Sequence, residues 1–146
     1  MSHAQHPPAV AATLSEWHRI IAAGALADLP PLLHPDALFR SPMVFKPYAS
    51  ANAVALILTT AFEVFEDFAY HRELASDDGL SAVLEFSARV GDKQLKGIDL
   101  IRFDAEGRIV EFEVMVRPMS GLQALGDAMG QRIGPRLAAF KVPATP

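Results

Sequence analysis

Cysteine is absent from the chain, which excludes disulfides, thiol nucleophiles and thiolate metal sites. Positive charge is the scarcer sign, since the chain has 13 Lys and Arg residues against 17 Asp and Glu residues. The resulting net charge of −4 argues against broad nucleic-acid binding. The longest apolar run, residues 53–62, is about half the roughly twenty residues that a membrane-spanning helix needs. The opening MSHAQHPP lacks the basic and apolar regions of an export signal. We therefore expect no nucleic-acid partner, no membrane partner and a cytoplasmic protein.

What the chain does contain is a folded domain's share of apolar residues. Of its 146 residues, 51% are hydrophobic and 21% are charged, which excludes a disordered chain and is typical of one domain with its own core. Residues 1–8 are expected to form a flexible tail, because Pro7 and Pro8 oppose an early helix.

Helical spacing dominates the first half. Val10, Leu14, Trp17 and Ile21 form one apolar stripe that predicts a helix ending at Gly24, where a left-handed conformation favours glycine. A short second helix is predicted around residues 28–33. A turn at residues 34–36 and a short strand at residues 37–41 follow, and then a helix at residues 51–64 with Ser50 as its cap.

The second half changes to strand spacing and then returns to helix. Four strands are predicted at residues 67–75, 80–90, 94–104 and 108–117, and their short connections indicate antiparallel neighbours. Ser120 and Gln123 resemble a capping box that opens a final helix, which Pro135 should kink or end. In that helix Gly126, Gly130 and Gly134 recur every four residues, which favours close helix packing. Helices followed by strands indicate an α+β fold, in which helices on one face of a curved antiparallel sheet would leave a pocket.

Asp99 is out of place on its predicted strand. Alternation puts this carboxylate on the most apolar face of the strand, beside Gly97 and Ile101. Burial among apolar groups would raise its pKa, so that it could donate a hydrogen bond or act as an acid or base. The alternative is a structural aspartate that is bonded to a backbone or hydroxyl group in the core.

A set of short motifs resembles a known superfamily. Gly24, Asp36-Ala37, Ser41-Pro42 and the run GIDLIRFDAEGRIVEF at residues 97–112 are similar to NTF2-like proteins, and more narrowly to the SnoaL-like and ketosteroid-isomerase-like branch. The resemblance implies a cone-shaped roll, also called cystatin-like, in which a curved antiparallel sheet wraps around N-terminal helices. Residues 9–117 would form this domain and residues 118–146 an added C-terminal helical extension.

The same resemblance suggests roles for individual residues. Ketosteroid isomerases use a tyrosine and a protonated aspartate as an oxyanion hole, and a second aspartate as the base. These positions match Trp17, Asp99 and Ser41 respectively, so only the oxyanion aspartate is kept and a true ketosteroid isomerase is not expected. An aspartate of the related epoxide hydrolases falls at Val114, which is apolar.

The expected site is therefore an apolar pocket for a small hydrophobic molecule, with Asp99 as its catalytic acid or oxyanion donor and with no cofactor. The side chains expected to bind the ligand are Trp17, Ser41, Leu84, Phe86, Ile101, Phe112, Val114 and Val116. Two functions stay open: an isomerase, cyclase or hydratase, and a non-catalytic binding or interaction domain. A second polar group within reach of Asp99 would favour the enzyme.

Three weaker features complete the sequence predictions. His71 and Glu73 share a face of their predicted strand but lack a third ligand, so no metal is expected. Tyr70, on the opposite face with Phe68 and Arg72, could reach the pocket, but edge-strand packing is the favoured interpretation. A homodimer is predicted through the sheet face that does not carry Asp99, because apolar positions there have a charged surround. The apolar positions are Val83, Ile98, Leu100 and Met115, and the surrounding charges are Lys96, Arg102, Glu111 and Glu113.

Overall fold

A computed structural model describes residues 6–137 and residue 140. Most of the predicted tail and the end of the predicted extension thus lie outside the described residues. The helices and strands, in chain order, are α1 (Pro8–Ala23), β1 (Leu33–Arg40), β2 (Tyr48–Ala49), α2 (Ala51–Val64), β3 (Glu66–Ala75), β4 (Ser81–Val90), β5 (Lys93–Phe103), β6 (Ile109–Arg117) and α3 (Met119–Leu137).

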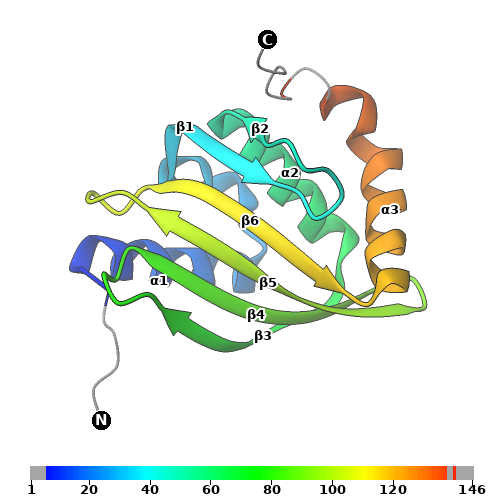
Figure 1. Ribbon diagram of the computed structural model, residues 1–146, viewed down its shortest axis with the longest axis horizontal. Helices are drawn as coiled ribbons and strands as arrows, with labels where there is room; N and C mark the ends of the chain where they lie inside the picture. The colour runs from blue at the N-terminus through cyan, green and yellow to red at the C-terminus, as the bar shows by residue number, and fades with distance from the viewer. Residues whose placement is uncertain (1–5, 138–139, 141–146) are drawn as a thin grey trace.

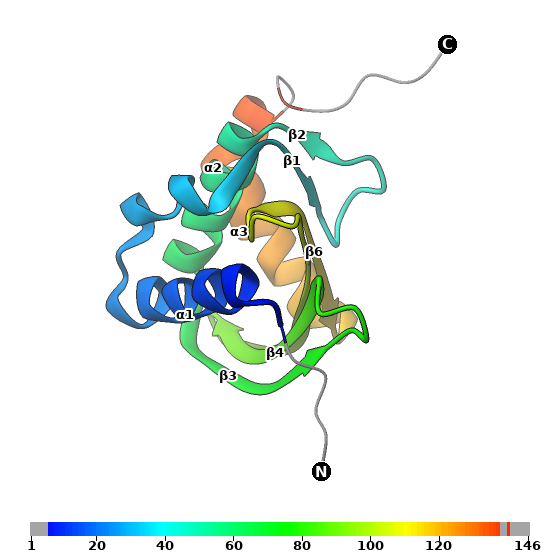
Figure 2. The ribbon, with the colours of Figure 1, turned by 90° about the vertical axis from the view of Figure 1, so that its left-hand side faces the viewer.

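Six strands form one curved sheet in the order β2-β1-β6-β5-β4-β3. All neighbours are antiparallel except β1 and β6, which are parallel, so the sheet is mixed where the sequence predicted an antiparallel one. The strands wrap around α1 and α2, and α3 runs along the side of the roll (Figures 1 and 2). This is the predicted α+β roll. Below, the face that carries Asp99 is called the concave face and the opposite one the outer face.

The helices follow their apolar stripes. Val10, Leu14, Trp17 and Ile20 of α1 are buried, and Gly24 ends the helix at φ 67°. The bounds of α2 are those predicted from the sequence, but the Ser50 side chain makes no capping hydrogen bond. No helix in the described part of the chain is both long and apolar enough to cross a membrane.

Three local predictions were wrong. The short helix at residues 28–33 is replaced by two 3-10 turns, Leu26–Asp28 and Pro30–Leu32. The turn at residues 34–36 is part of β1, which pairs with the unpredicted strand β2. The final helix begins at Met119, before Ser120, and the Gln123 amide donates to Asp127 instead of closing a capping box.

A bulge in β3 changes which face its side chains occupy. The register with β4 shifts between Tyr70 and Glu73, so alternation breaks there. Arg72 consequently lies on the outer face, where it binds Glu85, while Glu73 bonds His18 of α1. His71 contacts Ser87 instead. His71 and Glu73 therefore do not share a face, and the pairing considered for a metal is wrong.

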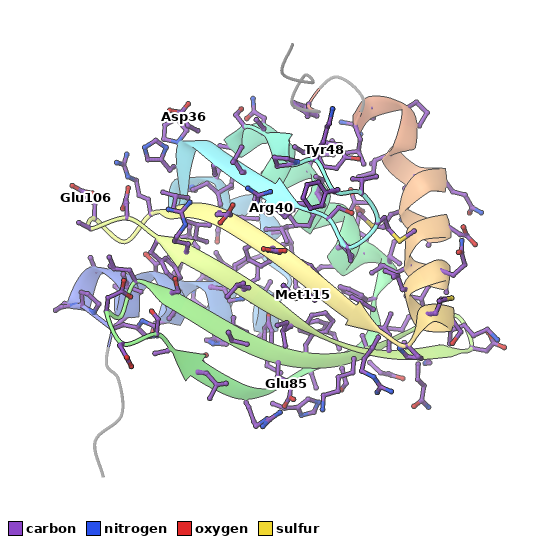
Figure 3. All side chains as sticks on the ribbon, viewed as in Figure 1. Asp36, Arg40, Tyr48, Glu85, Glu106 and Met115 are labelled. Carbon is purple, nitrogen blue, oxygen red and sulfur yellow. The ribbon has the colours of Figure 1, made fainter. Side chains whose placement is uncertain are left out.

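The outer face is charged and partly apolar. Figure 3 shows Arg40, Glu85 and Met115 on this face, turned away from α1 and α2. Glu85 is held by Arg72 and Lys96, and Glu111 by Arg40 and Arg102. Met115 is 44% exposed. One chain alone does not test the predicted homodimer, which stays a prediction.

Candidate active site

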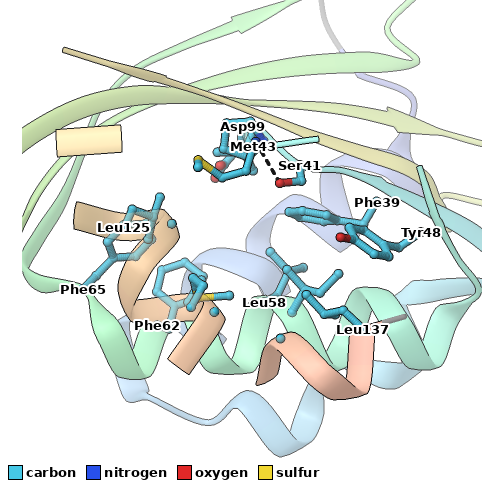
Figure 4. A pocket seen from close by; sticks show the side chains of 18 of the residues that line it. Phe39, Ser41, Met43, Tyr48, Leu58, Phe62, Phe65, Asp99, Leu125 and Leu137 are labelled. Atoms are coloured by element: carbon cyan, nitrogen blue, oxygen red, sulfur yellow. Dashed lines mark hydrogen bonds between the residues drawn. The ribbon is translucent and has the colours of Figure 1, made fainter. Parts of the chain in front are cut away.

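A cavity of about 350 Å³ lies between the concave face, α2, α3 and the segment after β1 (Figure 4). Its volume is within the range of small-molecule sites. Most of the wall is apolar. The lining residues include Phe39, Ser41, Met43, Tyr48, Leu58, Phe62, Phe65, Phe68, Phe86, Asp99, Val114, Leu125, Gly126, Met129, Gly130, Gly134 and Leu137.

Asp99 is the one carboxylate among the described lining residues, and it is only 4% exposed. The Tyr70 hydroxyl donates a 2.6 Å hydrogen bond to its Oδ2 atom. The indole Nε1–H of Trp17 donates in turn to the Tyr70 oxygen, over 3.0 Å. The chain of donors therefore runs from α1 through β3 to β5, and it leaves Oδ1 of Asp99 for a molecule in the cavity.

Burial governs the protonation of Asp99 and Tyr70. It raises the pKa of Asp99 to about 7, against a smaller lowering by the hydrogen bond from Tyr70. Burial and the neighbouring Asp99 also raise the pKa of Tyr70 well above its ordinary value, so Tyr70 stays a neutral donor. Near neutral pH both forms of Asp99 are populated, which is the condition under which one group can take and return a proton.

The Phe86 ring fits against β5 beside Asp99 because Gly97 lacks a side chain. A Cβ atom at Gly97 would come within 2.7 Å of the Phe86 ring and 2.4 Å of the Met115 carbonyl oxygen. Phe86 packs against Phe65 and Phe68, and the Phe68 ring meets that of Tyr70 edge-on. The apolar surroundings of this strand face are consistent with burial as the cause of the raised pKa of Asp99.

The residues expected to bind the ligand divide into two groups. Ser41, Phe86 and Val114 line the cavity together with Asp99. The other five lie outside the lining. Four of them are fully buried in the core behind it, namely Trp17, Leu84, Ile101 and Phe112, and Val116 packs against the core. Trp17 reaches the site indirectly, through Tyr70.

The interpretation of Tyr70 as edge-strand packing was wrong. Phe68 and Tyr70 lie two residues apart before the bulge, so both point to the concave face. That spacing of two aromatic residues was the available signal. The α2 wall was also missed, although the apolar character of α2 on several sides indicated that more than one face is covered.

Ser41 has no basic partner. Its Oγ accepts the backbone N–H of Met43 over 2.9 Å, the contact drawn in Figure 4. No His or second carboxylate is among the described lining residues. The hydroxyl proton of Ser41 thus has no base to receive it and is available to donate a hydrogen bond in the cavity.

Comparisons with known proteins agree with this architecture. The family model described as SnoaL-like domain matches residues 14–112. The crystal structure of a steroid delta-isomerase from Pseudomonas aeruginosa is 67% identical, with a TM-score of 0.87, and the match covers 91% of this chain and 97% of that one. An uncharacterized cystatin-like protein from Silicibacter pomeroyi DSS-3 is 31% identical, with a TM-score of 0.81 and 94% of each chain covered.

A more distant structure shares the fold alone. The epoxide hydrolase/cyclase-like enzyme SalBIII, of pyran ring formation in the polyether salinomycin, is 15% identical, with a TM-score of 0.61 over 75% of this chain and 90% of that one. A search of proteins with curated functions found no match. The family match spans more than half of the chain, and its fold is the one described above. This protein belongs to the SnoaL-like domain family.

Proposed function

We propose that this protein is an acid–base enzyme that moves a proton on a small, mainly hydrophobic ketone, with Asp99 taking and returning the proton. The observation that carries the proposal is a single carboxyl group in the mainly apolar described wall, with one oxygen held by Tyr70 and a pKa of about 7. A carboxylate poised near neutral pH is matched to general base catalysis, and proton transfer by such a group requires no cofactor.

The surrounding groups support a division of labour. The Asp99 carboxylate would remove a proton from the carbon beside the carbonyl group, and the protonated carboxyl would return it to another carbon of the same molecule. Ser41 lines the same cavity as Asp99 (Figure 4). Its hydroxyl would donate to the carbonyl oxygen as negative charge develops there. In this scheme Asp99 is the base and Ser41 is the oxyanion donor, which reverses the roles that the family positions imply.

The named activity of a relative supports the ketone as the first substrate class. The protein that is 67% identical is described as a steroid delta-isomerase. Such an activity transfers a proton from one carbon of a ketone to another carbon of the same molecule. Ser41 nevertheless stands where the second aspartate of ketosteroid isomerases is expected. We therefore expect slow turnover of a 3-oxo-Δ5 steroid relative to the two-aspartate enzymes, with Asp99 alone carrying the proton.

An assay of hydrogen exchange tests this without knowing the natural substrate. A panel of hydrophobic ketones, including a 3-oxo-Δ5 steroid, is incubated with the protein in deuterium oxide, and deuterium beside the carbonyl is followed by mass spectrometry. The wild type should accelerate exchange on at least one ketone. Asp99→Asn, which keeps shape and polarity, should lose 10²- to 10⁴-fold of that rate. Ser41→Ala should lose less, and Tyr48→Phe, which removes a hydroxyl elsewhere in the wall, should lose little.

The alternative is a protein that holds a hydrophobic molecule without changing it, and the mainly apolar lining favours it. It predicts that ketones bind without exchange, and that Asp99→Asn changes affinity by only about 1 kcal/mol, the worth of one hydrogen bond. Exchange at the same rate in the wild type and Asp99→Asn would contradict the role of Asp99. Binding with no exchange on any ketone would favour the alternative.

We also propose that the outer face pairs with a second copy of the chain. Exposed Met115 and half-buried Ile98 and Leu100 lie among charges of both signs, which suits a two-fold interface. Analytical ultracentrifugation at tens of micromolar should find a dimer, and Met115→Glu should weaken it. A monomeric wild type at that concentration would contradict the proposal.

A further inference from the structure

The glycines of α3 fall into two kinds. A Cβ atom at Gly121 would come within 2.7 Å of Leu95, and one at Gly126 within 2.5 Å of the end of Met43. At Gly130 and Gly134 an added Cβ would meet no atom of the described residues within 4 Å. The sequence prediction that the glycine repeat serves close helix packing is therefore wrong for Gly130 and Gly134, where the neighbouring space is open.

Left-handed backbone geometry does not explain these two glycines either. Neither has the positive φ angle that would favour glycine, and both lie inside the helix Met119–Leu137. Glycine is, after proline, the least favourable residue in a helix interior. Alanine would fit at Gly130 and would stabilise the helix there, so neither packing within the described residues nor conformation explains Gly130. Gly134 precedes Pro135, whose ring disfavours a helical residue that carries a Cβ atom just before it, so glycine has a conformational advantage at that position.

Both glycines line the cavity, at the part of its wall away from Asp99. In Figure 4 Asp99 lies at the top of the cavity and Leu137 at its lower right. Gly134 is three residues before Leu137 and Gly130 one turn earlier, so they share the cavity side of α3 with it. Gly130 is also exposed, so no described neighbour covers it.

This wall lies outside the part of the chain that the family model matches. The match ends at residue 112, whereas six lining residues come from α3. They are Leu125, Gly126, Met129, Gly130, Gly134 and Leu137. The acid of the site is thus supplied by the matched region and the far wall by the helix that follows it.

We propose that Gly130 and Gly134 determine the largest ligand this protein accepts, by leaving an open path along α3 for a molecule that is anchored at Asp99. The proposal rests on the proposed function in that the anchored end is taken to be the ketone. A small ligand ends before this part of α3, whereas a longer one passes beside the two glycines. Side chains at these positions would block only the longer one.

Binding of a size series tests the proposal without any activity. The ketones are cyclohexanone, 1-tetralone and a three-ring tetrahydrophenanthrenone, and each is paired with its parent hydrocarbon. Dissociation constants are measured by ligand-detected NMR for the wild type, Gly130→Leu and Gly134→Leu. Both variants should bind the three-ring compounds at least tenfold more weakly and cyclohexanone within twofold of the wild type.

Two further variants control for folding and for apolar surface. Gln131→Leu adds the same side chain at an exposed position of α3 that does not line the cavity, and it should leave every constant unchanged. Gly130→Ala should raise the melting temperature, and it should weaken the binding of the three-ring compounds less than Gly130→Leu does. If a leucine variant fails to fold, the alanine variants Gly130→Ala and Gly134→Ala supply the same comparison with a smaller shift.

The outcomes separate this proposal from the proposed function. Equal weakening of small and large ligands, or no weakening of either, would overturn the role of the two glycines. Failure of the wild type to bind any compound of either series would overturn it as well. If size selection is seen but ketones bind no better than their hydrocarbons, the glycine proposal stands and the anchoring of a ketone by Asp99 fails.

Discussion

Two carboxylates on neighbouring strands of the sheet have opposite protonation behaviour. Asp99 of β5 and Glu85 of β4 are 4% and 7% exposed, and they lie on opposite faces. The pKa of Asp99 is raised to about 7, chiefly by burial. The pKa of Glu85 is lowered to about 2, chiefly by hydrogen bonds from Arg72 and Lys96.

The difference shows that low exposure alone does not set the charge of a carboxylate. Glu85 is covered by the two cations that stabilise its ionised form. Asp99 instead pairs across the sheet with the apolar Leu84 and Val114, and its one donor, Tyr70, is neutral. A neutral donor compensates only part of the cost of burying a charge. The outer face therefore holds a permanent anion, and the concave face holds a group that titrates near neutral pH.

The largest expected effect is on stability as a function of pH. The folded pKa of Asp99 lies above its unfolded value of 3.8, so its contribution is full below pH 3.8 and is lost as pH rises through about 7. Relative to Asp99→Asn, the wild type should lose about 4 kcal/mol of unfolding free energy between pH 4 and pH 8. Urea denaturation across this range measures the difference. Parallel curves for the two proteins would mean that Asp99 does not titrate in the folded state.

Glu85→Gln should show a smaller effect with the opposite sign. The folded pKa of Glu85 lies below its unfolded value of 4.5, so its contribution is present above pH 4.5 and is lost as pH falls through about 2. The wild type and Glu85→Gln should therefore differ by a constant amount from pH 5 to pH 8 and converge in acid. Because Arg72 and Lys96 are exposed to salt, the difference should shrink at 1 M sodium chloride. A difference that grows in acid would contradict this assignment.

Removing the donor on Asp99 should widen the contrast between the two carboxylates. Tyr70→Phe deletes the hydrogen bond to Oδ2, which favours the ionised form, so the pKa of Asp99 should rise further above about 7. A bond worth about 1 kcal/mol corresponds to roughly 0.7 pH unit. Carbon-13 NMR of labelled aspartate carboxyl groups measures it. Tyr48→Phe is the control, since that hydroxyl makes no bond to Asp99, and an unmoved or lowered pKa in Tyr70→Phe would break the comparison.

Trp17→Phe should shift the same titration in the same direction by less. The indole donates to the Tyr70 oxygen, which makes the Tyr70 hydroxyl a better donor to Asp99. Without it the pKa of Asp99 should rise by a smaller amount than in Tyr70→Phe, and the double variant should match Tyr70→Phe alone. Additive shifts in the double variant would show that Trp17 acts on Asp99 by another route.

Much of this arrangement could be predicted from short-range patterns. The bounds of α2, the left-handed Gly24 and the burial of Asp99 follow from helical spacing, glycine geometry and strand alternation. Each depends on residues within a few positions of one another, so the sequence displays it directly. The family resemblance, carried by residues 97–112 among others, was confirmed by the match over residues 14–112.

Other parts depended on pairing between distant segments. The parallel pairing of β1 with β6 was not predicted, and the bulge after Tyr70 moved Arg72 to the outer face. A bulge is set by the register of the partner strand, which alternation within β3 cannot reveal. Contacts between distant segments also join the hydrogen-bonded side chains of the site. Tyr70 and Asp99 are 29 residues apart in the sequence, and Trp17 and Tyr70 are 53 residues apart.

By itself, the sequence determined that this chain folds as an α+β roll with one acid on an apolar strand face, because periodicity and the family motifs are local. Only the tertiary structure decided which side chain hydrogen-bonds that acid and how large the cavity beside it is. Tyr70 became its donor through strand pairing, and Gly130 and Gly134 became part of the cavity wall through the docking of α3. Both results follow from how separate elements pack, since the free energy of packing depends on surfaces that meet only in the folded chain.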